Sequence, residues 1–218
     1  MVCCNSRRVL LLLGLMALLV SGCASTDKKA TVDTPMETSG TAVAPIELIP
    51  NPYLARQVKV PPATETAFRN ALIAMQSEDW QTAENQLRNL HQQHPELSGP
   101  LVNLAIVYWQ QQKLDEADNY FQQALTVNPL NNDAYIQYGL FLREQGRFED
   151  AESHYLKALE IWPHNAVAHR NLGIVYDLYM GKFDEAMRHY EMVLRLSAEP
   201  NKEVEGWIID LKRRQAAG

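Results

Sequence analysis

The chain has 218 residues, of which 46% are hydrophobic and 21% are charged, and it contains only 10 glycines. This composition is typical of a globular protein and excludes collagen-like and wholly disordered chains. The formal net charge is −6 at pH 7, and the sequence has no stripe of lysine and arginine, so nucleic-acid binding, which needs such a stripe to neutralise phosphates, is not expected.

The first 22 residues form an export signal. Arg7 and Arg8 precede an uninterrupted apolar run from Val9 to Val20. Its 12 residues fall within the length of about 7 to 15 that a signal-peptide core has, and are too few for the roughly 20 that span a bilayer as a helix. We therefore predict that residues 1–22 are removed from the mature chain.

The residues that follow, VSGC at positions 20–23, resemble the lipobox of bacterial lipoproteins. The resemblance implies that Cys23 is the lipidation site and becomes the first residue of the mature chain; the alternative is an ordinary secretory cleavage beside an incidental cysteine. Several buried acyl chains, at roughly 0.8 kcal/mol per CH2, anchor a protein stably. Ala24, rather than an aspartate, follows the cysteine, which implies the periplasmic face of a Gram-negative outer membrane.

Residues 23–62 are predicted to be a flexible, disordered tether. They contain six prolines and no sustained helical periodicity. Proline removes a backbone donor and favours extended conformations, so this tether is stiffer than a Gly/Ser linker. The part from 46 to 58 is more apolar than the rest, which makes it a candidate for docking on the folded domain or on a partner.

Beyond Pro62 the same residue types recur at a fixed spacing. Prolines 95, 129 and 163 are 34 residues apart, alanines 83, 117 and 151 keep that spacing, and Ala186 follows one residue late. Apolar residues within each repeat lie at helical spacing, so each repeat is predicted to be two amphipathic helices. An alanine leaves room for a neighbouring aromatic ring, as Ala117 does for Phe121. The predicted units are 64–97, 98–131, 132–165 and 166–199, within a domain from 63 to 199.

The third unit, with YGLFLREQGRFEDAESHYLKALEIWP, and the second, with LVNLAIVYWQQQKLDEADNYFQQALTVNP, resemble tetratricopeptide repeats (TPR). The resemblance implies an all-α fold, an α-solenoid of about four antiparallel helix pairs. The first unit departs from the pattern at Asn70 and Ala74, where large apolar residues are usual. The fourth has one extra residue, which we place in YDLYMGKF at 176–183, and no closing proline until Pro200.

Residues 200–218 are predicted to form a helix that caps the stack. Val204, Ile208 and Leu211 are spaced i, i+4 and i+7, with polar residues on the opposite side. A terminal repeat needs such a cover because its open apolar face would otherwise aggregate.

Catalytic and metal-binding motifs are not readable in the sequence. His91 and His94 are close enough on one helix to share a metal with Glu96, but no third ligand on a neighbouring helix is evident. Paired acids such as Asp115 and Glu116 recur at the repeat spacing, which indicates first-turn helix acids rather than general acids. We expect no enzyme activity, no cofactor and no metal.

The TPR resemblance places one face of each first helix on the concave wall of the superhelix. There, Asn103, Gln137 and Asn171 would form a row of amides able to bond an extended peptide, above an apolar floor of Ile106, Trp109 and Leu140. The alternative is that the aliphatic residues belong to the core between helices. The predicted partner-binding groove comprises Asn103, Ile106, Trp109, Gln137, Leu140, Arg143, Arg170 and Asn171.

These features together predict a membrane-anchored periplasmic adaptor that binds other proteins or peptides of the cell envelope. The alternative is a pilotin-like assembly factor for type IV pili or secretins, since lipidated TPR proteins also have that role. An enzyme is the third possibility.

Overall fold

The computed structural model describes residues 46–52 and 59–217. The predicted signal peptide, the lipidation site Cys23, and the parts of the tether at 24–45 and 53–58 lie outside the described residues. The chain divides into a unit of residues 1–42 and a unit of residues 43–218, and every described residue belongs to the second unit.

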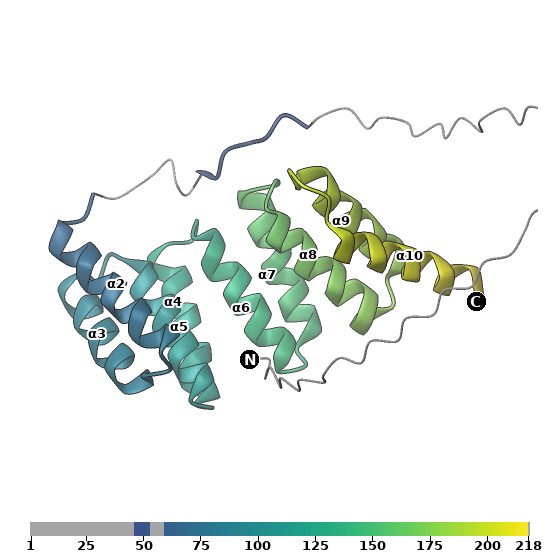
Figure 1. Cartoon of the computed structure of the whole chain (residues 1–218). Helices are drawn as coiled ribbons and strands as arrows, with labels where there is room; N and C mark the ends of the chain where they lie inside the picture. The colour runs from purple at the N-terminus through teal and green to yellow at the C-terminus, as the bar shows by residue number, and fades with distance from the viewer. Residues whose placement is uncertain (1–45, 53–58, 218) are drawn as a thin grey trace, which may run out of the picture. The chain divides into compact units, whose positions relative to one another are not determined.

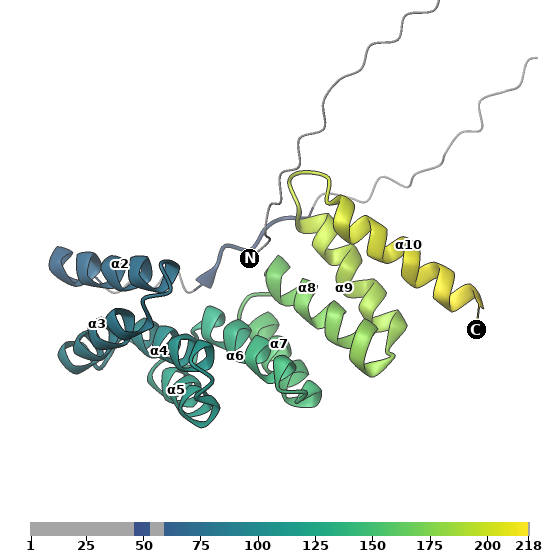
Figure 2. The same ribbon diagram turned by 60° about the horizontal axis from the view of Figure 1, so that its bottom comes forward.

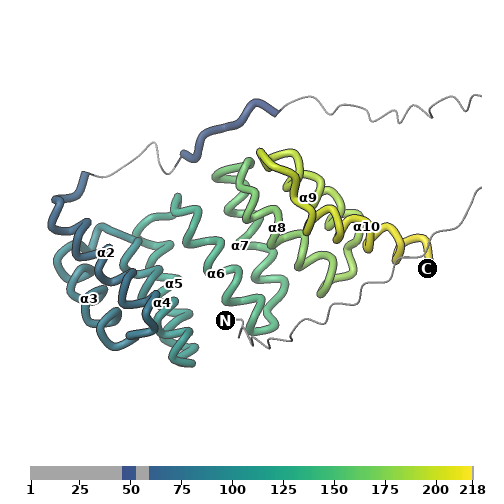
Figure 3. The backbone as a smooth tube through the Cα atoms, in the orientation of Figure 1, coloured from purple at the N-terminus to yellow at the C-terminus, as the bar shows by residue number. Residues whose placement is uncertain are grey.

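The described residues contain helices and no strand, which confirms the predicted all-α class. Successive helices pack in antiparallel pairs, and the pairs follow one another in chain order (Figures 1, 2 and 3). The helices are α2 (Pro62–Gln76), α3 (Trp80–Gln93), α4 (Ser98–Gln110), α5 (Leu114–Val127), α6 (Asn132–Glu144), α7 (Phe148–Ile161), α8 (Ala166–Ile174) with the π-helix η1 (Val175–Met180), α9 (Phe183–Leu196) and α10 (Lys202–Ala217).

The turn between the two helices of each pair needs one residue with positive φ. In the third and fourth units these residues are Gly146 and Gly181, with φ of 74° and 64°. The first two units use Glu78 and Gln112 at the same repeat position, with φ of 58° and 61°. A side chain disfavours this conformation, so packing of the helix pairs must hold these two turns in place.

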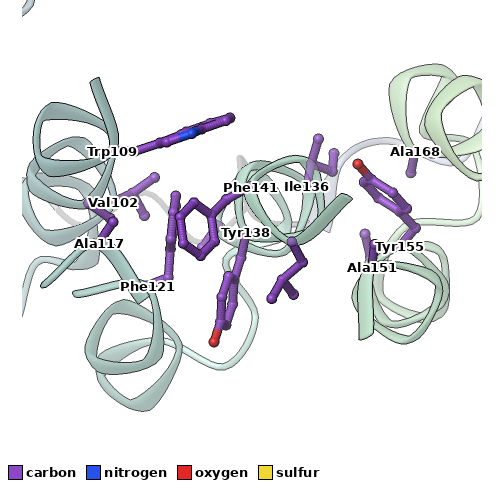
Figure 4. Close-up of a cluster of buried hydrophobic side chains, with 14 of the residues drawn as sticks. Val102, Trp109, Ala117, Phe121, Ile136, Tyr138, Phe141, Ala151, Tyr155 and Ala168 are labelled. Carbon is purple, nitrogen blue, oxygen red and sulfur yellow. The ribbon is translucent and has the colours of Figure 1, made fainter. Parts of the chain in front are cut away.

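Small residues let the helices approach each other closely. The four repeat alanines, at 83, 117, 151 and 186, have no exposed surface. Beside Ala117, the buried ring of Phe121 stacks on Tyr138 and tilts against Phe141, with ring centroids 5.1 and 5.6 Å apart (Figure 4). The alanines and aromatic residues that recur at the repeat spacing therefore pack between neighbouring helices, as predicted.

The extra residue of the fourth unit lies in the π-helix η1, Val175–Met180. A π-helical turn bonds each residue to the fifth along and so takes in one more residue than an α-helical turn. The carbonyl of Tyr176 accepts the amide of Lys182 at 2.9 Å, which closes the turn after Gly181. The insertion is thus absorbed without disturbing the start of α9.

The last helix, α10, packs on α9 as predicted for a cap. Val204, Ile208 and Leu211 are buried, and the ring of Trp207 lies 5.3 Å from that of Tyr190. Arg214 extends from α10 to the buried Asp177, with Nη2 and Oδ1 2.6 Å apart. Within the part of the chain that is described, no helix has the length and apolarity needed to cross a bilayer.

Candidate peptide-binding surface

Three of the predicted groove residues lie where their side chains serve the fold. Trp109 is only 7% exposed and meets Phe141 edge-on at 5.6 Å, within the core. Asn171 is also 7% exposed. Asn103 is half-buried, and its side-chain nitrogen donates to the carbonyl of Gly99 at 2.9 Å, one turn earlier in α4.

The other five predicted residues are half-buried on the first helices of the units. Ile106 and Leu140 pack against the core, as the alternative interpretation of the aliphatic residues expected. Arg170 is engaged by the capping helix, since it pairs with Glu203 at 3.2 Å and lies 4.9 Å over the ring of Trp207. Gln137 and Arg143 complete the set, and Gln137 lines a cavity at the start of α6 and α8.

That cavity, of about 670 Å³, lies at the start of α6 and α8 and is bounded on one side by an extended segment from the tether. We call residues 46–52 the strap. Leu48 and Ile49 of the strap line the cavity together with Ile136 and Gln137 of α6 and Val167 of α8. In Figure 1 the strap is the dark segment above α6 to α9.

The strap is held at one residue through its backbone. The amide of Ile49 donates to Nδ1 of His164 at 2.8 Å, and its carbonyl accepts from Nε1 of Trp162 at 2.7 Å. Both side chains come from the turn between α7 and α8, which Asn165 caps by accepting the amide of Ala168 at 3.0 Å. The Trp162–His164 pair was not among the predicted groove residues.

A second set of residues that the sequence analysis missed joins neighbouring units. Three side chains meet at each junction. One is an acid in the second helix of a unit, one is the cation just before the second helix of the following unit, and the third is a tyrosine. Arg147 pairs with Asp118 at 3.1 Å and Lys182 with Glu152 at 3.0 Å, while the Tyr138 hydroxyl donates to Asp118 at 2.9 Å. The residues are Glu84, Asp118 and Glu152; Lys113, Arg147 and Lys182; and Tyr108, Tyr138 and Tyr176.

These junctions are structural rather than reactive. Burial, together with the neighbouring Asp118, raises the pKa of Tyr138 to about 12, so the hydroxyl stays protonated and donates. The 34-residue spacing of the acids was visible in the sequence, but it did not show that each one faces a cation of the following unit. Asparagines form a similar link, since Asn131 donates to Ser98 at 2.9 Å and Asn165 donates to Asn132.

The histidines do not form a metal centre. His94 contacts Thr64 at 2.9 Å and Glu96 at 3.2 Å, and within the described residues no group of three His, Cys, Asp or Glu is placed to hold a metal ion. His169 and His189 form a pair, with their Nδ1 atoms 2.8 Å apart. Burial, then His169 and Arg188, lower the pKa of His189 to about 4.

The acids at the start of the second helices are where the sequence placed them. Asp115 and Glu116 lie in the first turn of α5, and the corresponding pairs begin α7 and α9. There they face the positive end of the helix dipole.

Comparison with solved structures finds helical-repeat proteins. PilF of Pseudomonas aeruginosa is 27% identical, with a TM-score of 0.65 over 71% of this chain and 70% of that one. PilW, described as a widely conserved type IV pilus biogenesis factor, is 22% identical, with a TM-score of 0.56 over 62% of each chain. YrrB, described as a TPR protein with an unusual peptide-binding site, is 20% identical, with a TM-score of 0.51 over 63% of this chain and 70% of that one. The last two show the fold alone.

A search of curated proteins finds no significant match. Two family models, both described as tetratricopeptide repeat, match residues 74–138 and 131–199. Together they span all four predicted units apart from the start of the first, and the helix pairs, the repeat alanines and the buried aromatic rings follow the same period. The chain belongs to the tetratricopeptide-repeat family.

Proposed function

We propose that this protein is a non-enzymatic adaptor that binds extended segments of other envelope proteins through its TPR units. The observation that carries the proposal is the strap. An extended segment lies beside Gln137 and is held by side chains that bond its backbone, which is how such a surface would hold a peptide of another protein.

The test is affinity capture from envelope extracts with the repeat domain as bait. A Gln137→Ala, Arg143→Ala bait should retain less of the captured protein, because Gln137 lines the cavity beside the strap and Arg143 is a half-buried predicted groove residue further along α6. The matched control is Glu191→Ala, an exposed change on α9. Equal capture by all three baits would place recognition outside this face.

The proposal includes a lipid anchor at Cys23 that holds the domain at the periplasmic face of the outer membrane. We expect Cys23→Ser to move the protein from the membrane to the soluble periplasmic fraction, because only the acyl chains are lost. Fractionation of cells that express either form measures this, with circular dichroism of the mutant as the control for folding. A mutant that stays in washed outer membranes would refute lipid anchoring.

A second candidate is assembly of type IV pili or secretins. It is favoured by the likeness to PilF, which extends over most of both chains at 27% identity, and by the fold shared with PilW. Deletion of the gene in its native bacterium should then reduce surface pili or secretin multimers. Normal pili and secretins in the deletion strain, with captured partners unrelated to either, would leave the general adaptor role.

A further inference from the structure

The third unit carries a feature that its neighbours lack. The residues that hold the strap, Trp162 and His164, have counterparts 34 residues earlier at Asn128 and Leu130, and again at His94 and Glu96. In those units Asn128 accepts the amide of Leu130 at 3.0 Å, and His94 contacts Glu96 at 3.2 Å and Thr64, 30 residues earlier, at 2.9 Å. Among the described residues, the third unit alone has both side chains bonded to a segment over 100 residues away. Departures from a repeat are expected at functional sites, so this remote contact makes the third unit a candidate binding site.

The strap has the properties of an extended ligand. Pro50 keeps Ile49 out of the helical region and in an extended conformation. The Trp162–His164 pair bonds the amide and carbonyl of Ile49, which any residue except proline would offer. The side chains of Leu48 and Ile49 remain 63% and 49% exposed, so much of their surface is not used for binding.

We propose that the Trp162–His164 pair, with the cavity between α6 and α8, is a binding site for extended, proline-containing aliphatic segments, and that the strap occupies it as an intramolecular ligand. A partner segment of the same kind competes with the strap and releases the tether when it binds. This inference rests on the proposed adaptor function and names both the site and the class of segment.

The factor by which the strap weakens the binding of a partner segment can be predicted. A ligand on a short linker has an effective concentration on the order of millimolar. If the strap itself binds the site with a dissociation constant of about 100 µM, a partner peptide would therefore bind the wild-type chain about tenfold more weakly than the empty site. Each backbone hydrogen bond lost would weaken the strap by a further factor of about 2 to 10.

The experiment uses the mature chain with Cys23→Ser and a capped peptide that copies residues 46–52. The variant Ile49→Pro removes the amide that donates to His164. The matched control is Glu47→Pro, which introduces a proline two positions earlier. The two hydrogen bonds that hold the strap do not involve the amide of residue 47. The readout is the indole Nε1–H resonance of Trp162, one of four tryptophans in the chain, assigned by its loss in Trp162→Phe.

We expect the Trp162 indole proton to exchange slowly in the wild type and in Glu47→Pro, and faster in Ile49→Pro. The peptide should bind Ile49→Pro about two- to tenfold more tightly than the wild type and restore slow exchange. Trp162→Phe should weaken binding of the peptide. Indole exchange that is the same in all strap variants, or equal peptide affinity for them, would overturn the proposal.

Protection of Trp162 that disappears on dilution together with a dimer would show that the strap comes from a second copy, and would also overturn it. These outcomes are separable from the adaptor function. Failed capture from envelope extracts leaves the indole result intact, whereas successful capture with no change at Trp162 means that partners bind at another surface.

Discussion

Gly139 lies where the ring of a buried tyrosine fills the space of a side chain. A Cβ at this position would be 2.7 Å from Cε1 of Tyr155, whose ring has no exposed surface and cannot move away. We expect Gly139→Ala to lower the free energy of unfolding by about 1 to 2 kcal/mol, because the clash exceeds the gain in helix propensity. Gly206→Ala is the control: nothing lies within 4 Å of its Cβ, so the change in α10 should be neutral or stabilising. Urea denaturation of both variants measures this, and equal stability would contradict the close approach of α6 and α7.

The His169–His189 pair gives the domain a pH dependence. The Nε2 of His169 bonds the carbonyl of Pro163 at 2.9 Å and Nδ1 accepts from His189, so both rings are held neutral. Since the folded pKa of His189, about 4, lies below the ordinary value of 6.5, only the unfolded chain takes up a proton between these values. Stability should therefore fall as the pH drops from about 6.5 to 4, by at most about 3 kcal/mol.

The measurement is the difference in unfolding free energy between wild type and His189→Gln across that range. The glutamine variant should show a smaller loss on acidification, because one buried titrating group is gone. Parallel curves for the two proteins would mean that the ring of His189 is solvated in the folded state.

Residue by residue, the structure confirms the predicted core, whereas the groove stays a prediction in which some residues are buried. The repeat alanines and their aromatic neighbours were recognisable because packing repeats in every unit and therefore leaves a period. Trp109 and Asn171 were assigned to the groove by their position in the repeat, but side-chain direction within a helix depends on the neighbouring unit, and both are buried. Trp162 and His164 could not be found by period, since they occur in one unit only.

Each helix pair depends on the turn that joins its helices. Gln112 holds φ at 61°, a conformation that glycine adopts without strain. We expect Gln112→Gly to raise the free energy of unfolding by about 0.5 to 1 kcal/mol. The adjacent change Gln111→Gly is the control, because Gln111 has φ of −81° and glycine there only adds flexibility to the unfolded chain. Thermal melting compares the stability of the two variants. Destabilisation by both changes would show that the Gln112 side chain matters to the fold.

At the level of elements, the sequence located the helices and the insertion but not how the insertion is accommodated. One residue too many in 176–183 could have lengthened the turn or a helix. The structure places it in η1, where Asp177 is buried and bonded by both Arg214 and Tyr190. That choice depends on α10, an element outside the repeat, so no pattern within the fourth unit could predict it.

For the whole molecule, the units form one continuous core from Ala71 to Leu211, and the cap covers its last face. This continuity made the fold predictable, because each unit buries its apolar surface only against its neighbours. The strap is different. It joins residue 49 to the turn after α7, a contact that neither periodicity nor composition encodes, although the apolar character of 46–58 indicated that the segment could dock.

The adaptor function is tested most directly by site-specific photo-crosslinking in the native bacterium. A photoreactive amino acid at Gln137 reports on the face beside the strap, and one at Glu191, exposed on α9, is the control position. We predict that light links position 137 to another envelope protein, and that position 191 gives no such product. Crosslinks from 191 alone, or none from 137 in cells where the protein is abundant and correctly exported, would contradict the proposal that this surface binds a partner.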